Sequence, residues 1–571
     1  MRRRNVCAFI LALAVALAAA LPNRLEAQES RSFVIEPIPP EVLANLPFEM
    51  PEVKLPKFPE RRFDVREYGA VADGRTMNTG AFSRAIEACA KSGGGMVVVP
   101  AGEYLTGPIR LESNVNFHVE RGALIIFSPK FEDYPLIPFP NPTSKSLRCT
   151  PPIFGYKLEN VAVTGSGVFD GSGEAWRPAK KEKFTEREWK AIVKSGGVVS
   201  DDGRMWYPSK EAMNGEAYLK ALYKGKKQPT AAEVAGAREY LRPKMVELYD
   251  CERVLLDGPT FRNSPQFAVH PAQCEHVVVR NVTIQNPENA QNGDGLDLSA
   301  CHTVVVYRTV VDAGDDAICI KAGNPGKEKK WTASCENIVI TDCTVYHGHG
   351  GFVIGSETDG GARNILARRL TMLGTDVGLR FKSPRGRGGL VEKIFVDSVV
   401  MKDIQNEAVL FDTFYESGSA EKNASSRDAS RTKEDVAEGT PQFSGFTISN
   451  ITCYGAARPL LFLGLPEMPI KNISITHSVF TTDKGALLVD ADSIRLDDVK
   501  LFPKIGPVYT VNESKRILIA RGAAPAALGD VFMEVKGEGA EGIVIEKTDL
   551  TSLKTPVTTA SGASSAAVTL R

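Results

Sequence analysis

The sequence lacks an excess of charge of either sign, because its 571 residues contain 69 Lys+Arg and 69 Asp+Glu. A chain without net charge has no strong field that would attract nucleic acid or an anionic surface. The ten cysteines also include no Cys-x-x-Cys motif. We therefore expect no nucleic-acid partner and no metal held by paired cysteines.

Long apolar runs are equally scarce, and the single candidate lies near the N-terminus. Three arginines precede an apolar run over residues 9–21, which is short for a span of about 20 residues. Charged, apolar and small-residue regions in that order are typical of a secretory signal peptide. We expect residues 1–27 to be removed, with cleavage after Ala20 or Ala27. The mature protein is then secreted or periplasmic, without a membrane span, and we expect a monomer.

What the sequence has in quantity is turn residues and short β-branched runs. It contains 50 Gly and 35 Pro, and runs rich in Val and Ile recur between them. One segment pattern repeats at intervals of 23 to 34 residues. Its clearest copies begin at Cys251, Cys274, Cys301 and Cys335, and weaker copies cover 364–366, 393–396, 446–448 and 472–475. A period in the twenties, with strands and no intervening helices, predicts an all-β fold, the parallel β-helix.

The recurring cysteines have an interpretation within such a coil. Each opens a similar strand, so we expect stacked small core residues in preference to disulfides or a metal site. Nine cysteines follow the apolar N-terminal run. An odd number leaves at least one free thiol in an exported protein.

Several segments depart from the strand pattern. Residues 28–60 are Pro-rich and aperiodic, which indicates an extended arm along the body. Residues 61–550 form one β-helix domain, entered by an amphipathic helix over 78–90 that caps the first coil. Within it, residues 174–240 are charged and favour helix. Two capping-box patterns, Thr185 with Glu188 and Thr230 with Glu233, indicate a helical insertion beside the cleft.

Two further segments are polar. We expect residues 416–440 to form a mobile loop. Beyond residue 485 the repeat fades into short strands such as 542–545. Residues 551–571 are small and polar, so we expect a loose C-terminal tail.

Three aspartates are the candidate chemical groups. Asp294 and Asp315 are nearly one coil apart, so they should lie on adjacent coils of one face. Asp316 begins the run Asp316-Ala317-Ile318-Cys319-Ile320, where Gly314 can re-aim it. Crowded carboxylates repel one another, and some then keep a proton at neutral pH. One protonated and one ionised carboxylate is what cleavage of a glycosidic bond needs. A single Asp beside Gly more often caps a turn.

The order of the blocks decides between these interpretations. Asn292-Gly293-Asp294, Gly314-Asp315-Asp316, Gly348-His349-Gly350 and Arg380-Phe381-Lys382 follow one another. This order resembles the polygalacturonase family of glycoside hydrolases, family 28, of the bacterial exported type. One departure is Gly293, where that family usually has Thr. We expect little effect, since this position is not one of the acids.

The resemblance implies a right-handed, pectin-lyase-like β-helix and an inverting hydrolase of α-1,4-linked galacturonate in pectin, without metal or cofactor. It implies that Asp315 is the general acid, with a raised pKa, while Asp294 and Asp316 hold and deprotonate the attacking water. An acid and a base in an inverting pair stand about 6.5–9.5 Å apart. His349 would orient Asp315, and His347 is an unassigned rival. The expected substrate-binding residues are Arg380, Lys382, Asn292, Tyr415, Gln266 and His270.

Alternatives remain within and beyond this class. Whether the enzyme cuts inside chains or from their ends is open, although an insertion that walls off the groove favours exo action. A rhamnogalacturonan-directed galacturonidase is the nearest alternative. A Ca²⁺-dependent pectate lyase on the same fold is another, because the aspartates resemble a calcium site. The third is a carbohydrate-binding β-helix without catalysis.

Overall fold

The computed structural model describes residues 35–140, 146–225, 228–323, 334–415, 432–523 and 531–571. Residues 39–571 form one compact unit, to which the following description is confined. The signal peptide expected over 1–27, the start of the arm expected over 28–60, and most of the loop expected over 416–440 lie outside the described residues. None of the helices in the described part has the length and apolar character of a membrane-spanning helix.

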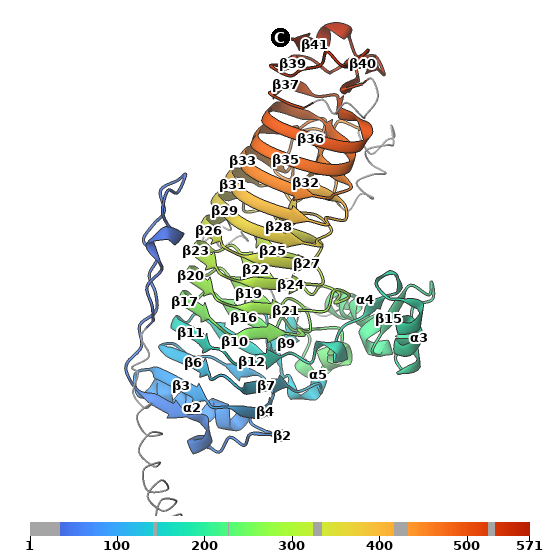
Figure 1. Ribbon diagram of the computed structural model, residues 1–571. Coiled ribbons are helices and arrows are strands. Elements are labelled where there is room, and N and C mark those ends of the chain that lie inside the picture. The colour runs from blue at the N-terminus through green and yellow to red at the C-terminus, as the bar shows by residue number, and fades with distance from the viewer. Residues whose placement is uncertain (1–34, 141–145, 226–227, 324–333, 416–431, 524–530) are drawn as a thin grey trace, which may run out of the picture. The chain divides into compact units, whose positions relative to one another are not determined.

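The body is a right-handed parallel β-helix whose coils follow one another along the chain, as the repeats predicted (Figure 1). Each full coil adds one strand to each of three parallel ladders. Ladder A contains β1 (Arg62–Asp64), β3 (Gly95–Val99), β6 (Val115–Val119), β11 (Glu159–Gly165), β17 (Glu252–Asp257), β20 (Glu275–Arg280), β23 (His302–Tyr307), β26 (Cys335–Thr341), β29 (Ala362–Leu373), β31 (Leu390–Lys402), β33 (Gln442–Tyr454), β35 (Ile470–Val489), β36 (Ala491–Asn512), β37 (Lys515–Ala520), β39 (Ile543–Glu546) and β41 (Val568–Leu570).

Ladders B and C complete each coil. The long strands β29, β31 and β33 turn a corner and contribute to ladders A and B, while β35 and β36 contribute to all three. Ladder B contains β2 (Asp73–Met77), β4 (Gly102–Thr106), β7 (Ala123–Phe127), β12 (Val168–Asp170), β18 (Thr260–Arg262), β21 (Thr283–Gln285), β24 (Val310–Ala313) and β27 (Thr344–His347). Ladder C contains β5 (Ile109–Arg110), β10 (Ile153–Tyr156), β16 (Val246–Tyr249), β19 (Val269–Ala272), β22 (Leu296–Ser299), β25 (Asp316–Lys321), β28 (Gly350–Ile354), β30 (Leu379–Lys382), β32 (Glu407–Asp412), β34 (Arg458–Leu463), β38 (Met533–Lys536) and β40 (Val557–Ala560).

Ladder A shows why the sequence repeats. Val254 pairs with Val277, which pairs with Val304, and the register continues to Ile338. All four side chains are fully buried. Burying each such side chain contributes about 1.5–3 kcal/mol, so equivalent positions on successive coils favour the same apolar residues. Beyond residue 485 the ladder continues through β36 and the short strands β37, β39 and β41, so the structural repeat persists where the sequence repeat fades.

The cysteines that open these strands are core residues, as predicted. Cys251, Cys274, Cys301 and Cys335 are buried, and all nine cysteines of the described residues are free thiols. The residue two places after each of the first three adopts a left-handed backbone, with φ of 57° at Arg253, 54° at His276 and 56° at Thr303. That left-handed residue recurs at the same place in successive coils.

The first coil is covered by the predicted helix. Helix α2 (Thr79–Lys91) buries Phe82, Ile86 and Cys89 on one side. Phe82 packs against Tyr104 and Phe117 of the first coils, with ring centroids 5.9 Å apart in both pairs. The helix therefore closes the end of the apolar interior that would otherwise face water. The short 3-10 helices are η1 (Pro40–Val42), η2 (Val65–Tyr68), η3 (Phe131–Asp133), η4 (Gly173–Ala175), η5 (Lys181–Lys183), η6 (Ala235–Ala237) and η8 (Ser565–Ala567).

The segment predicted as a helical insertion is mostly helical and lies to one side of the coils (Figure 1). Both predicted capping boxes form, on Thr185 and on Thr230. The segment also holds a small antiparallel sheet that the sequence did not predict. Its elements are α3 (Glu186–Lys194), α4 (Lys210–Gly225), α5 (Ala231–Val234), β13 (Ala179–Lys180), β14 (Val198–Val199) and β15 (Met205–Tyr207), and a separate hairpin pairs β8 (Leu136–Pro138) with β9 (Leu147–Cys149).

Two terminal segments complete the unit. Residues 39–60 lie along the coils, where the Arg368 guanidinium donates to the main-chain oxygens of Glu41, Val42 and Ala44. The C-terminal residues 551–571 do not form a loose tail. Strand β40 pairs with β38 and β41 pairs with β39, because these polar strands continue ladders C and A by main-chain hydrogen bonds.

Candidate active site

The three aspartates come together at the end of ladder C where its strands begin. Strand β22 pairs with β25 through Leu296 and Ile318, which places Asp294 level with Asp316 on the next coil. The main chains are joined there by a hydrogen bond from the Gly295 N–H to the Asp316 carbonyl, 2.9 Å long. One carboxylate oxygen from each of Asp294, Asp315 and Asp316 lies within 4.8 Å of the others. Adjacent coils thus bring Asp294 and Asp315 together, as their spacing predicted, and Asp316 joins them.

Glycines allow the turns around these acids to pack closely. A Cβ at Gly314 would lie 2.5 Å from the Pro287 oxygen, and one at Gly348 would lie 2.7 Å from the Asp315 oxygen. Gly348 also has a left-handed backbone, with φ of 96°. At Gly293, a Cβ would lie 2.6 Å from the Ala290 Cβ. The glycine that replaces the usual Thr therefore fits the local packing in this chain.

Two cations from β30 hold Asp316. The Arg380 Nη1 lies 3.0 Å from Asp316 Oδ1, and the Lys382 Nζ lies 2.7 Å from Asp316 Oδ2. They share a face, as their spacing of two residues predicted. The Tyr415 ring lies beside both, with its centroid 4.8 Å from the Lys382 Nζ. The Arg380 Nε has no hydrogen-bond partner among the described residues. Arg380 and Lys382, which we expected to bind substrate, thus neutralise Asp316, and the Arg380 Nε remains as a donor.

Of the two histidines, His349 is the one at the acids. Its Nδ1 lies 3.2 Å from Asp315 Oδ1, and its main-chain N–H donates to the Asp315 carbonyl over 2.9 Å. Its Nε2 lies 3.8 Å from Asp376 Oδ2. His347 instead pairs with Asp312 at 3.0 Å on ladder B.

The charges around the three acids give them different proton affinities. Burial raises the pKa of Asp294 well above its usual value, and the neighbouring Asp297 and Asp315 raise it further. Burial acts on Asp316 too, but Lys382 and Arg380 outweigh it and hold the Asp316 pKa well below the usual range. Burial also acts to raise the pKa of Asp315, but the hydrogen bond and charge of His349, together with the charge of Lys382, outweigh it and lower the pKa. The raised pKa that we expected at Asp315 is therefore wrong for the free site, where Asp294 is the acid with the raised value.

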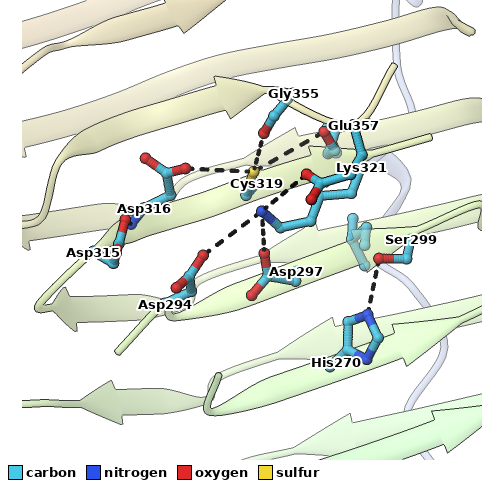
Figure 2. A network of polar contacts seen from close by, with 12 residues as sticks. His270, Asp294, Asp297, Ser299, Asp315, Asp316, Cys319, Lys321, Gly355 and Glu357 are labelled. Carbon is cyan, nitrogen blue, oxygen red and sulfur yellow. Dashed lines mark hydrogen bonds and ion pairs between the residues drawn. The ribbon is translucent and has the colours of Figure 1, made fainter. Parts of the chain in front are cut away.

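A buried lysine that the sequence reasoning left without a role joins this cluster. The Lys321 Nζ lies 3.4 Å from Asp297 Oδ1, 3.7 Å from Asp294 Oδ2 and 3.7 Å from Glu357 Oε2. Figure 2 shows this ammonium between the three carboxylates. Asp297 stands between two core leucines, and Lys321 ends a strand of core isoleucines. A charged residue within an apolar strand is the sequence feature that could have indicated Asp297 and Lys321 as site residues.

The remaining expected binding residues lie in other contacts. His270 is buried, with Nε2 2.8 Å from Ser299 Oγ and Nδ1 3.4 Å from Glu247 Oε1. The Asn292 Oδ1 accepts a hydrogen bond of 2.9 Å from Arg242. The Gln266 main-chain oxygen accepts a hydrogen bond from the Ser264 hydroxyl. None of these contacts is with one of the three aspartates.

A pocket of about 670 Å³ lies beside His349, between the insertion and the turns of ladders B and C. The Lys183 Nζ donates to the Gly314 carbonyl over 2.8 Å, which fixes the insertion against the turn that carries Asp315. The lining residues are Glu182, Lys183, Phe184, Thr185, Glu188, Pro287, Glu288, Asn289, Gly314, Gly348, His349, Gly374, Asp376 and Gln405.

Three close carboxylates also suggest a cation. In this site the ammonium groups of Lys382 and Lys321 and the guanidinium of Arg380 contact Asp316 and Asp294 at ion-pair distances. The positive charge that carboxylates at this spacing require is thus supplied by the chain itself. We therefore do not assign these aspartates as metal ligands.

Comparisons with known proteins agree with this geometry. The model of glycosyl hydrolases family 28 matches residues 220–436, which include all four motif blocks. A rhamnogalacturonase A/epimerase, pectate lyase-like model matches residues 62–120. A probable polygalacturonase from Vitis vinifera is 26% identical over 416 residues, 69% of this chain and 74% of the grape protein.

Two bacterial proteins extend the comparison. An exo-poly-α-D-galacturonosidase from Dickeya chrysanthemi is 28% identical over 407 residues, which are 68% of this chain but only 61% of the relative, less than two thirds of its length. The crystal structure of a hyperthermoactive exopolygalacturonase from Thermotoga maritima matches with a TM-score of 0.62 and 29% identity. That match covers 81% of this chain and 93% of the Thermotoga chain.

The protein is a glycoside hydrolase, because it combines a parallel β-helix and clustered aspartates with similarity to these enzymes. More narrowly, the chain is similar to glycosyl hydrolases family 28 in the part that carries the motif blocks, and to family members along most of its length. The alternative of a carbohydrate-binding β-helix without catalysis is therefore wrong.

Proposed function

We propose that the protein hydrolyses α-1,4-linked galacturonate bonds in pectic polysaccharide or oligogalacturonides. The observation that carries the proposal is the meeting of Asp294, Asp315 and Asp316 beside the cations Arg380 and Lys382. Acids cleave the sugar bond, and cations attract a sugar that carries a carboxylate. The names of the Dickeya and Thermotoga relatives support this substrate class. The expected N-terminal signal supports secreted or periplasmic action.

In the proposed reaction, a water attacks the anomeric carbon while the bond to the leaving oxygen breaks. Asp294 and Asp316 hold the water and take its proton, and Asp315 gives a proton to the leaving oxygen. Asp315 suits the acid role because its side chain is the most accessible of the three, 17% exposed against 4% for Asp294 and 2% for Asp316. His349 orients it.

Substrate binding supplies the raised pKa that Asp315 lacks in the free site. The carboxylate of a bound galacturonate adds a negative charge and draws on the same Arg380 and Lys382 that neutralise the acids. The sugar also excludes water. Both changes disfavour an ionised Asp315, so its pKa rises in the complex.

The spacing of the acids bears on the stereochemistry. The nearest oxygens lie within 4.8 Å, closer than the separation of about 6.5–9.5 Å between the carboxyl groups of an inverting pair. A short separation is typical of retaining enzymes, in which one carboxylate attacks the sugar. We propose inversion, because Asp316 is held by two cations that weaken it as a nucleophile for carbon. The configuration of the first product decides between the two.

We further propose that the enzyme acts from chain ends. The insertion touches the Gly314 turn through Lys183, so it stands directly beside the catalytic acids. An open groove would need free space on both sides of these acids. The names of the Dickeya and Thermotoga relatives also denote exo action.

Chromatography of early digests tests this proposal. Polygalacturonate should release galacturonate monomer or dimer, whereas a mixture of longer oligomers would contradict exo action. Rhamnogalacturonan digested in parallel reports on the nearest alternative substrate. Release of soluble products from that polymer alone would overturn the substrate assignment. The variant Asp315→Asn serves as the inactive control.

A further inference from the structure

We propose that Lys321 is a positioning residue that favours the charged form of the Asp294 carboxylate and aims it at the attacking water, with Asp297 as the counter-charge that holds Lys321 in place. This inference rests on the proposed function, because it assigns the base role to Asp294. It adds two residues to the machinery that the family motif blocks leave without a role.

The geometry singles out this lysine. Among the residues that the structure describes, Lys321 is the one cation that forms an ion pair with Asp294, at 3.7 Å. The Asp294 Oδ1 has no hydrogen-bond partner among them, so little else stabilises its negative charge. Arg380 and Lys382, by contrast, both point at Asp316. The two acids that we assign to the water therefore have separate cations.

Asp297 explains why the lysine stays in position. Its side chain is fully buried, and Lys321 Nζ lies 3.4 Å from its Oδ1. Asp297 stands on β22 next to the strand of Lys321, and it pairs in register with Cys319. Glu357 contacts the ammonium from a third element at 3.7 Å. Lys321 is thus fixed from three sides, at the cost of a second negative charge near Asp294.

Other charged groups surround this arrangement on each neighbouring strand. Each of these groups stays in place in the variants, so its effect on the pKa of Asp294 is common to all the proteins compared. They are Glu247 of β16 with Lys244 beside it, His270 of β19, Arg242 at the end of the insertion, Asp315 and Asp316 at β25, His349 before β28, and Arg380 and Lys382 of β30.

The electrostatic consequence has a definite sign. Burial raises the pKa of Asp294, Asp297 and Asp315 raise it further, and Lys321 lowers it. Removing the lysine therefore makes Asp294 keep its proton to a higher pH. Removing Asp297, whose pKa burial raises to about 7, does the opposite to the extent that Asp297 is ionised. Lys321 and Asp294 lie 3.7 Å apart in a buried site, where one unit charge shifts the pKa of its neighbour by about one unit or more.

The experiment is the pH dependence of kcat/KM on polygalacturonate for Lys321→Met, Asp297→Asn and Lys321→Arg. An active Asp294 must be ionised, so it sets the acid limb of the profile. We expect Lys321→Met to move that limb to higher pH by about one unit or more, which is about a tenfold loss of activity on the limb. We expect Asp297→Asn to move it to lower pH, and Lys321→Arg to leave it in place.

Controls separate this role from a structural one. A change that merely loosens the fold lowers kcat at every pH and leaves the limb where it was, and that result would overturn the inference. If Lys321→Met does not fold, the downward shift of Asp297→Asn still tests it, as does the double variant, whose limb should return toward that of the wild type. Glu357→Gln, which alters Lys321 from the far side, should shift the limb least.

The outcome for the wild type distinguishes the two claims. A wild-type protein that does not hydrolyse polygalacturonate contradicts the proposed function. A wild type that hydrolyses it, with acid limbs that coincide in all variants, contradicts only the role of Lys321 and Asp297.

Discussion

The ammonium of Lys382 lies 2.7 Å from the carboxylate of Asp316, although the two residues are on different coils and 66 positions apart in the chain. Both side chains are almost completely buried, with 5% and 2% of their surface exposed. This contact ties the residue that we expected to bind substrate to one of the acids that we assign to the water. If Lys382 binds substrate as we propose, substrate binding and the ionisation of Asp316 depend on one another.

Replacing Lys382 tests that relationship. We expect Lys382→Met to lower kcat/KM on polygalacturonate by roughly 10²- to 10³-fold, because breaking a buried charge pair costs about 2–5 kcal/mol. The remaining Asp316 also keeps its proton to a higher pH. A matched control is Lys504→Met, which removes an exposed lysine from an ion pair of 2.8 Å with Asp483. Equal losses of kcat/KM in Lys382→Met and Lys504→Met would contradict the assignment of Lys382 to the active site.

The acid role of Asp315 has its own signature. We expect Asp315→Asn to lower kcat on polygalacturonate by about 10²- to 10⁴-fold, the usual contribution of general acid catalysis. An aryl galacturonide whose leaving group needs little protonation should lose much less. Asp312→Asn is the control, because Asp312 pairs with the other histidine, His347, at 3.0 Å. A variant that loses both activities equally would remove Asp315 from the acid role.

We expect the buried Asp412 to make the stability of the protein depend on pH. Burial raises the pKa of Asp412 to about 6, against 3.8 ordinarily. Between these values the folded protein binds more protons than the unfolded chain, so the free energy of unfolding falls as pH rises. Asp412→Asn lacks this proton. The free energy of unfolding of Asp412→Asn, relative to that of the wild type, should therefore rise by about 2–3 kcal/mol between pH 4 and pH 7.

Denaturant melts of both proteins at the two pH values measure this gain. The side-chain amide introduced by Asp412→Asn retains an oxygen that can accept the hydrogen bond from the Phe414 N–H, 2.8 Å long in the wild type. A difference in stability that is the same at both pH values would show that Asp412 titrates normally.

The glycine turns predict a local packing effect. A Cβ at Gly314 meets main-chain oxygens at 2.5 Å and 2.6 Å, so Gly314→Ala must displace the turn that carries Asp315. We expect a loss of activity of more than about tenfold and a lower melting temperature. Gly225→Ala is the matched control: a Cβ there meets no atom within 4 Å, and alanine at this last residue of α4 favours helix. An active, equally stable Gly314→Ala protein would contradict the packing account.

The sequence predicted those parts of the fold that depend on local repetition. The copies that begin at Cys251 and Cys274 predicted stacked strands, because each coil buries equivalent residues in the same register. The sheet of β13, β14 and β15 was not predicted, since strands of two or three residues have no periodicity to detect. The pairing of β40 with β38 was missed for a related reason: it depends on main-chain bonds and not on apolar side chains.

The candidate site was likewise predicted from the sequence only in part. The order of the motif blocks predicted that Asp294, Asp315 and Asp316 meet, and they do. The lowered pKa of Asp315 depends on a contact with His349 from the following coil, which spacing alone does not reveal. Lys321 was missed because its acidic partners come from two other segments, Asp294 and Asp297 at β22 and Glu357 after β28.

The most direct measurement is proton NMR of polygalacturonate during the first minutes of digestion. The account predicts saturated galacturonate that appears first as the β-anomer, since a single displacement by water inverts the α-linkage. An α-anomer as first product would contradict the single displacement. An unsaturated sugar whose formation stops on chelation of calcium would identify a lyase, and would contradict the central claim that these aspartates hydrolyse the bond.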